Sequence, residues 1–187
     1  MVEILYAKEL LKWKDRVLNE LKNGKIAIYP TDTIYGIGCN ALLDEPVKKI
    51  RELKNRPSTP FSVIAPFVEW IDENCIIDKV FLDKLPGPYT FICKTKGKIV
   101  SSEVNPGLDS LGTRLPDNWF STLISEMDIP FVTTSVNKSG ERYMTSLEDI
   151  DHDLINKVDF IIYDGPKDGR PSTIFDFTKD EPEVIER

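Results

Sequence analysis

The sequence predicts an α/β fold in which helices flank one twisted β-sheet that mixes parallel and antiparallel strands. Segments with helical periodicity alternate with short β-branched, apolar segments along the chain. Several neighbouring strands are joined by connections too short for a parallel crossover, so some pairs must be antiparallel. The length of 187 residues and the hydrophobic content of 41% suit one sizeable core, and we expect a single domain over residues 1–187.

The first predicted elements are a helix over residues 7–23 and a strand over residues 25–29. Leucine and valine recur at helical spacing in the first segment, and Gly24 is placed to end the helix. Pro30 stops the strand, so residues 31–38 are expected to form a loop at its carboxyl end. Ligands of α/β proteins bind at such strand ends, which makes this loop a candidate binding segment.

The rest of the chain continues the alternation of helices and strands. Ser146 and Asp149 resemble a capping pair at the start of the last predicted helix. We find no internal repeat, low-complexity tract or long polar linker, so the elements are expected to share one core. The predicted helices cover residues 45–55, 117–127 and 147–156, and the predicted strands cover residues 61–65, 89–94, 110–115, 130–134, 158–163 and 173–177.

Charge and cysteine content limit the function classes. The net charge of -7 and the pI near 4.9 argue against a protein coated by nucleic acid, although they allow a local basic pocket. The three cysteines, Cys39, Cys75 and Cys93, lack CxxC spacing, which favours a reducing compartment, and we interpret them as core or surface fillers. We find no metal-ligand cluster. Charged residues from position 3 onward argue against a signal peptide or membrane span, so we expect a cytoplasmic protein without membrane contact.

The loop after the first predicted strand carries three hydroxyl groups. Thr31, Thr33 and Tyr35 lie between Pro30 and Gly36, in a segment suited to grip a polar ligand. It is neither a Walker A loop nor a dinucleotide fingerprint, because the required glycines and lysine are absent. The alternative is a turn whose Thr and Asp side chains bond their own backbone.

Two cations stand at the end of the second predicted helix. Lys54 and Arg56 precede Pro57, which is expected to turn both outward. A compact ammonium and a planar guanidinium together suit the neutralisation of a triphosphate. The alternative is a solvated helix end whose cations complement the helix dipole.

A third polar segment follows the strand predicted at residues 130–134. Thr133, Ser135 and Asn137 fall on one face by the period of two, so all three are aimed at one site. Their hydroxyl and amide groups suit phosphate oxygens and a magnesium-bound nucleotide without a catalytic histidine. The alternative is an ordinary exit from a strand into a loop.

Other polar residues give weaker signals. Residues 168–173 place Ser172 and Thr173 before a predicted strand, and Arg114 suits either a carboxylate ligand or a structural acid. His152 is the only histidine and is expected at the surface, within a charged run. Hydrolase chemistry based on a Ser–His–Asp or Cys–His arrangement is therefore disfavoured.

Taken together, these segments resemble the YrdC/TsaC family, also called Sua/YciO/YrdC. The family carries a PTDTxYG-type loop, a KxRP cluster, a PGPxT stretch, an SxN–SG loop and a late Ser–Thr pair. Each motif is weak alone, but the five occur in the family's order across nearly the whole chain. Here they stand at Pro30–Gly36, Lys54–Pro57, Pro86–Thr90, Ser135–Gly140 and Ser172–Thr173.

The resemblance implies a YrdC-like fold around a concave nucleotide cleft, and L-threonylcarbamoyladenylate synthase activity. Such an enzyme makes threonylcarbamoyl-AMP and pyrophosphate from ATP, L-threonine and bicarbonate, for the t6A modification of tRNA. It implies Mg²⁺ carried by ATP, with no metal site built from protein side chains, and a downstream threonylcarbamoyl transferase complex of the TsaD/Kae type as partner. Hydroxyl, lysine, arginine and asparagine groups suit a reaction that needs positioning and charge neutralisation more than a nucleophile.

The resemblance also implies roles for individual residues, and it leaves the general base unassigned. The catalytic set is Lys54, Arg56, Ser135 and Asn137; the ATP-binding set adds Ser58, Ser110, Tyr143 and Arg187; the threonine-binding set is Thr31, Thr33, Tyr35, Arg114, Thr133 and Ser172.

The sequence departs from the family pattern in two places. The spacer after Pro57 is short, and an apolar residue near Ile64 replaces a histidine common in the family. Residues 89–92 and 111–114 are also similar to the YciO branch, so the alternative is an RNA-binding module of this fold, for tRNA or double-stranded RNA, without synthase activity. The intact KxR and SxN groups favour the enzyme. Because the sequence ends at Arg187, we expect the short form, without the carboxyl-terminal domain of the long Sua-type members.

Overall fold

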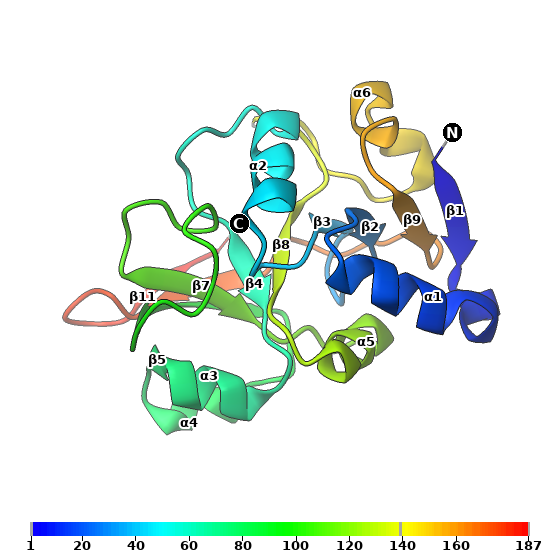
Figure 1. Ribbon diagram of the computed structural model, residues 1–187. Coiled ribbons are helices and arrows are strands. Elements are labelled where there is room, and N and C mark those ends of the chain that lie inside the picture. Colours follow the sequence, from blue (N-terminus) through cyan, green and yellow to red (C-terminus); the bar gives the residue numbers. More distant parts are fainter. Residues whose placement is uncertain (1, 139, 187) are drawn as a thin grey trace.

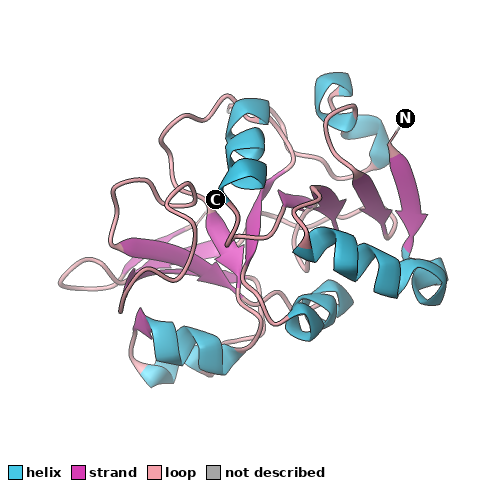
Figure 2. Ribbon diagram, viewed as in Figure 1, coloured by secondary structure: helices cyan, strands magenta, loops and turns pink. Residues whose placement is uncertain are grey.

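The computed structural model describes residues 2–138 and 140–186, and it confirms a mixed sheet with flanking helices (Figure 1). Helices and strands alternate along the chain (Figure 2). The strands are β1 (Glu3–Tyr6), β2 (Ala27–Tyr29), β3 (Gly36–Gly38), β4 (Ser62–Ile64), β5 (Cys75–Ile76), β6 (Tyr89–Thr95), β7 (Ser110–Arg114), β8 (Phe131–Ser135), β9 (Phe160–Tyr163), β10 (Thr173–Asp176) and β11 (Glu183–Ile185). The α-helices are α1 (Leu10–Lys22), α2 (Asp44–Leu53), α3 (Val68–Asn74), α4 (Lys79–Leu82), α5 (Trp119–Met127) and α6 (His152–Ile155), and 3₁₀ helices are η1 (Ala7–Glu9) and η2 (Leu147–Asp149).

The described strands form one sheet in the order β1-β9-β2-β3-β8-β4-β7-β6-β10-β11, and β5 pairs with β6 outside this path. Parallel pairing joins β9 to both β1 and β2, β4 to β7, and β6 to β10. The other pairs are antiparallel. Long crossovers and short reversals therefore coexist in one sheet, as the connection lengths predict.

Both faces of the central strands are buried, which explains why β2 is apolar at every position. Ile28 packs in a cluster with α2, whereas Ala27 and Tyr29 pack with α1 and α5. Figure 1 shows α1 and α5 together on one side of the sheet and α2 on the other. A third cluster, which includes Ile71 of α3, Leu82 of α4 and Phe91 of β6, fills the part near β5 and β6.

Most predicted elements are confirmed with small shifts at their ends, but the segment 31–38 is wrong as a continuous loop. Residues Gly36–Gly38 form β3, which pairs with β2 and β8. Glycine is depleted in β-strands, so the sequence Gly36–Ile37–Gly38 does not predict a strand. The backbone needs glycine here, because a Cβ on Gly38 would lie 1.8 Å from the carbonyl oxygen of Val132.

Other differences concern short or exposed elements. The predicted helix 7–23 begins with the 3₁₀ helix η1, and the predicted helix 147–156 is divided into η2 and α6. The capping pair of Ser146 and Asp149 is confirmed, but it caps η2. The sequence patterns also missed β1, α3, β5, α4 and β11. Among the helices of the described chain, none combines the length and apolar character needed to span a bilayer.

Candidate functional site

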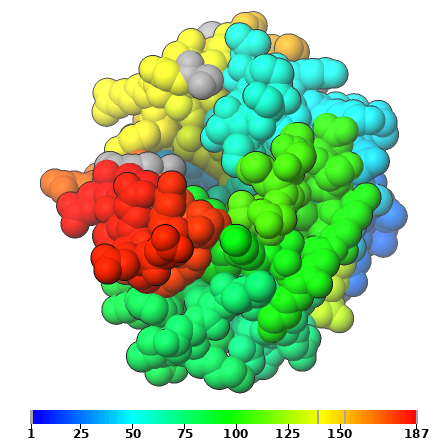
Figure 3. All heavy atoms as spheres, turned by 90° about the vertical axis from the view of Figure 1, so that its left-hand side faces the viewer, coloured from blue at the N-terminus to red at the C-terminus, as the bar shows by residue number. Residues whose placement is uncertain are grey.

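A polar cavity opens where the ends of several strands and their following loops meet. Its volume is about 140 Å³, smaller than the roughly 300–1,000 Å³ of pockets that enclose a drug-sized ligand. Figure 3 shows the surface hollowed between the red C-terminal segment, the yellow segment after β8 and the cyan segment around α2. None of the described lining residues is acidic. They are Thr31, Ile34, Tyr35, Gly36, Arg56, Pro60, Phe61, Ser62, Thr90, Arg114, Thr133, Thr134, Ser135, Tyr143, Pro171 and Ser172.

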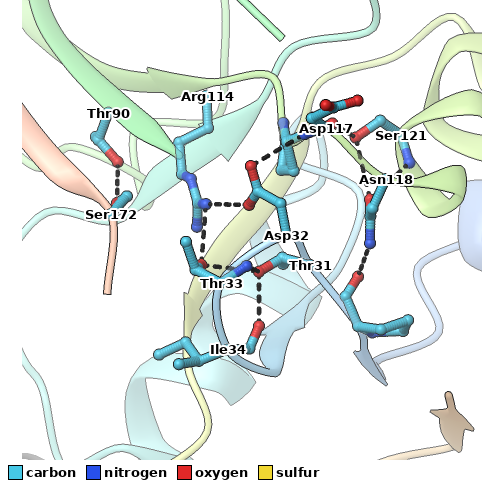
Figure 4. Close-up of polar contacts among 12 residues, drawn as sticks. Thr31, Asp32, Thr33, Ile34, Thr90, Arg114, Asp117, Asn118, Ser121 and Ser172 are labelled. Atoms are coloured by element: carbon cyan, nitrogen blue, oxygen red, sulfur yellow. Dashed lines mark hydrogen bonds and ion pairs between the residues drawn. The ribbon is translucent and has the colours of Figure 1, made fainter. Parts of the chain in front are cut away.

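Arg114, the last residue of β7, is buried beside the loop that follows β2 (Figure 4). Its Nη2 donates to Asp32 Oδ1 at 3.0 Å and to Thr33 Oγ1 at 3.2 Å. The other carboxylate oxygen of Asp32 accepts the backbone N–H of Asp117 at 3.0 Å. Arg114 therefore pairs with a structural acid, which is one of the two alternatives that its sequence position allowed, and it also lines the cavity.

The loop of residues 31–36 bonds its own backbone and also faces the cavity. Thr31 Oγ1 donates to the Ile34 carbonyl at 2.6 Å and accepts from Thr33 N at 3.1 Å. Thr33 contacts Arg114 but is not among the described lining residues. The Tyr35 hydroxyl donates to the Gly165 carbonyl at 2.6 Å, and burial raises its pKa. The self-bonded turn is thus confirmed, and the same segment lines the cavity.

The segment before β10 closes the cavity on another side. Ser172 and Thr90 of β6, both buried, share a hydrogen bond of 2.7 Å between their hydroxyl groups (Figure 4). A Cβ on Gly169 would lie 2.1 Å from the Thr33 carbonyl oxygen, so this segment passes directly over the 31–36 loop. Residue 169 must be glycine, because a side chain there would clash with the Thr33 carbonyl. Thr173, which begins β10, is not among the described lining residues.

Lys54 is directed inward, so the prediction that Pro57 turns both cations outward is wrong for this residue. Its Nζ donates to the carbonyl of Ser135, to the carbonyl of Asn137 at 2.7 Å and to Asn137 Oδ1 at 3.2 Å. The physical reason is that these oxygens can satisfy all three N–H groups of a buried ammonium. Burial, followed by repulsion from Arg56, lowers the pKa of Lys54 to about 7.

Arg56 and the end of β8 complete this part of the cavity. Arg56 Nη1 donates to Thr134 Oγ1 at 3.3 Å, and its guanidinium lies 5.4 Å from the centre of the Phe61 ring. Thr133 and Ser135 line the cavity, as the strand alternation predicts, and Thr134 does so as well. Asn137 is outside the described lining but accepts from Ser135 Oγ at 2.6 Å.

Several predicted residues are not brought to the cavity. Ser58 is exposed in the turn after α2, and Ser110 begins β7, at the end of that strand opposite Arg114. Arg187 lies outside the described residues, as does the side chain of His152. Tyr143 lines the cavity, and its role in ATP binding stays a prediction.

The cysteines lie in the core. Cys39, Cys75 and Cys93 are buried, and burial raises the pKa of each thiol, to about 11 for Cys75. Thiolate chemistry is disfavoured at all three. In the described chain, no cluster of His, Cys, Asp or Glu is arranged to hold a metal ion.

Sequence reasoning missed several residues that shape the cavity. Thr90 and Asp32 lie within the family motifs, but their residue types alone do not predict a role. Phe61 and Ser62 are predicted only as parts of a strand, and Arg51 is absent from the predicted site. A cationic residue on the apolar face of α2, beside Ile50 and Leu53, was the available signal for Arg51.

A twisted α/β sheet whose cavity has guanidinium and hydroxyl groups, and no acid among its described lining residues, is typical of proteins that bind a small anionic or zwitterionic molecule. The family profile Sua5_yciO_yrdC, described as "Telomere recombination", matches residues 19–187. The chain therefore belongs to the Sua5/YciO/YrdC family.

Individual proteins agree with this assignment. The putative threonylcarbamoyl-AMP synthase of Methanocaldococcus jannaschii is 36% identical over 184 residues, which cover 95% of this chain and 86% of that protein. The crystal structure of Pyrococcus abyssi Sua5 complexed with L-threonine matches with a TM-score of 0.85 and 27% identity, over all of this chain and 57% of that one. Escherichia coli YciO shares the fold, with a TM-score of 0.85 and 23% identity over 100% and 96% of the two chains.

Proposed function

We propose that this chain is an L-threonylcarbamoyladenylate synthase, which makes threonylcarbamoyl-AMP and pyrophosphate from ATP, L-threonine and bicarbonate. The observation that carries the proposal is the lining of one cavity by two guanidinium groups and many hydroxyl groups, with no acidic residue among its described members. All three substrates bring a negatively charged group, and arginine fits carboxylate and phosphate oxygens in a bidentate way. The relatives that carry the name of this enzyme support the proposal.

The chemistry requires two bonds to form in sequence. The threonine amine attacks bicarbonate, forming a C–N bond and releasing water, which gives a carbamate. A carbamate oxygen then attacks the α-phosphorus of ATP, and the bond to the β-phosphate breaks as pyrophosphate leaves. Neither step needs a protein nucleophile, so the contribution of the protein is to align the reactants and to neutralise their charge.

We assign the enclosed part of the cavity to threonine. A volume of about 140 Å³ suits a small amino acid better than a nucleotide. We assign the carboxylate to Arg114 and the remaining polar groups to the hydroxyl groups of Thr31, Thr133 and Ser172, because all four residues line the cavity. Thr33 acts through its hydrogen bond with Arg114, and Tyr35 contributes to the cavity wall.

We assign the nucleotide to the surface that continues past Arg56, Ser135 and Tyr143. Lys54 and Asn137 support Ser135 from behind through their mutual hydrogen bonds. ATP brings its Mg²⁺ as part of the substrate. Roles for Ser58, Ser110 and Arg187 in ATP binding stay predictions.

The biological setting follows from the product. Threonylcarbamoyl-AMP is a reactive mixed anhydride, and we propose that a downstream threonylcarbamoyl transferase complex of the TsaD/Kae type consumes it to modify tRNA at the t6A position. We expect this activity in the cytoplasm, where ATP and tRNA are found.

Product analysis by mass spectrometry tests the proposal. Purified protein is incubated with magnesium-ATP, L-threonine and bicarbonate, and each substrate is omitted in turn. A threonylcarbamoyl-AMP signal that requires all three supports the synthase. Its absence from protein that is folded by circular dichroism rejects the synthase; RNA binding that weakens steeply with salt would then favour the RNA-binding alternative.

A further inference from the structure

Arg51 of α2 is a buried cation whose described hydrogen-bond partners are all main-chain carbonyl groups. Only 6% of the residue is exposed to solvent. Nε donates to the Glu103 carbonyl at 2.7 Å, and Nη2 donates to the Val104 carbonyl at 3.3 Å. Nη1 donates to the carbonyls of Arg56 and Thr59, both at 2.9 Å. No ion pair with a carboxylate appears for Arg51 in the described chain.

These four carbonyls belong to two segments that lie far apart in the sequence. Arg56 and Thr59 lie in the turn that leads from α2 to β4, and residues 103–104 lie in the connection from β6 to β7. The Arg51 guanidinium thus joins α2, the turn and the connection at one point. A planar group with five N–H donors is suited to this task, whereas an ammonium is not.

The same guanidinium also supports the side chain of Arg56. Arg51 lies 4.6 Å from the centre of the Phe61 ring, and Arg56 lies 5.4 Å from the same ring. The Phe61 N–H donates to the Val104 carbonyl at 2.8 Å, the oxygen that Arg51 Nη2 also contacts. Arg51 therefore restrains Arg56 at its backbone carbonyl and at the ring beneath its charge.

We propose that Arg51 is a positioning residue for the nucleotide phosphates, acting by fixing where the Arg56 guanidinium stands in the cavity wall. This rests on the proposed ATP-dependent function. The role is selective. Arg51 contacts the turn that carries Arg56, and it shares none of its described partners with Arg114. Loss of Arg51 geometry should therefore weaken the handling of ATP and leave that of threonine nearly intact.

The test compares Arg51→Lys, which keeps the charge but loses the fork, with Lys49→Met, which removes an exposed charge from the same helix. Binding of a non-hydrolysable ATP analogue and of L-threonine is measured separately by calorimetry. Arg51→Lys is expected to weaken analogue binding about tenfold while threonine binding changes less than about twofold, and Lys49→Met to change neither by more than about twofold. Equal weakening of both ligands, or of neither, would overturn the proposal and leave Arg51 a structural residue.

Two further measurements keep the outcomes separate. If Arg51→Lys does not fold, the Arg51 Nε–H signal of the wild-type protein is followed by NMR; slower solvent exchange with the ATP analogue but not with threonine supports the proposal, and equal protection by both contradicts it. Wild-type protein that binds neither ligand would instead contradict the proposed function.

Discussion

Asp32 and Arg114 form a buried ion pair, with 3.0 Å between Oδ1 and Nη2 and only 9% of each side chain exposed. The second oxygen of Asp32 accepts the N–H of Asp117, and the Asn118 side chain donates to the Pro30 carbonyl at 2.8 Å. The loop after β2 is therefore fastened to the end of β7 and the start of α5. Arg114 takes its place in the cavity wall as a consequence of this fastening.

Replacing Asp32 is expected to destabilise the whole fold. Asp32→Asn leaves the Arg114 cation buried without its acid and places an amide donor opposite one of the N–H groups. The free energy of unfolding should fall by about 3–5 kcal/mol at neutral pH. Asp117→Ala, which removes an exposed carboxylate but keeps the backbone donor, should stay within about 0.5 kcal/mol of wild type. Urea unfolding measures the free energy of unfolding of both variants. Equal values would show that the Asp32–Arg114 ion pair does not stabilise the fold.

Gly169 should control the fit of the cavity around threonine. Gly169→Ala forces the segment before β10 away from the Thr33 carbonyl, because the new Cβ would lie 2.1 Å from that oxygen. Ser172 moves with the segment, so threonine affinity should drop by about tenfold or more. Gly97→Ala is the matched control, since nothing lies within 4 Å of its Cβ position. Calorimetry with threonine should separate the two variants, and similar affinities would refute the expectation.

Titration of Lys54 should make stability depend on pH. The pKa of Lys54 is about 7 in the folded protein against 10.5 for an unperturbed lysine. Between these values the unfolded chain holds a proton that the folded protein has released, so this residue makes the free energy of unfolding rise with pH. The slope is at most about 1.4 kcal/mol per pH unit.

The comparison of wild type with Lys54→Met isolates this contribution from other titrating groups. The stability of wild type relative to the variant should be flat below pH 7 and should grow as the pH rises from 7 toward 10.5. Urea unfolding at a series of pH values measures it. A difference that stays constant across that window would show that Lys54 keeps its proton.

Two serines that were predicted together to bind ATP should differ in effect. Ser135 lines the cavity and donates to Asn137 at 2.6 Å, whereas Ser110 stands at the opposite end of β7 from Arg114. Ser135→Ala should weaken binding of an ATP analogue by about fivefold or more, because the amide oxygen of Asn137 loses a donor. Ser110→Ala should leave binding unchanged. A loss of affinity in Ser110→Ala would restore its predicted role and show that the nucleotide reaches that end of the strand.

The sequence was most informative where burial decides structure. Helices α1, α2 and α5 and strands such as β2 bury apolar side chains, so their periodicity is visible in the residues. Strand β3 is held by backbone pairing of two glycines, and all three residues of β11 are exposed, so neither leaves a side-chain pattern. Such strands form because segments elsewhere in the chain provide their hydrogen-bonding partners.

In the candidate site too, some features can be predicted from the residue type and others depend on the packing of distant segments. Hydroxyl groups and cations could be named from motifs because their chemistry is in the residue type. The inward direction of Lys54 and the pairing of Asp32 with Arg114 depend on which segments pack together, and those segments are about 80 residues apart. The position of Arg51 on the apolar face of α2 predicts burial, but its four carbonyl partners lie on segments that only the fold brings together.

The place of β9 between β1 and β2 also bears on how the chain is made. Both neighbouring strands are synthesised more than 100 residues before β9. At the usual rate of synthesis, the backbone N–H and C=O groups of β2 that pair with β9 stay unpaired for on the order of ten seconds. A nascent chain with that edge unpaired is prone to pair with other chains, so we expect a longer wait, as in slower translation, to lower the yield of soluble protein.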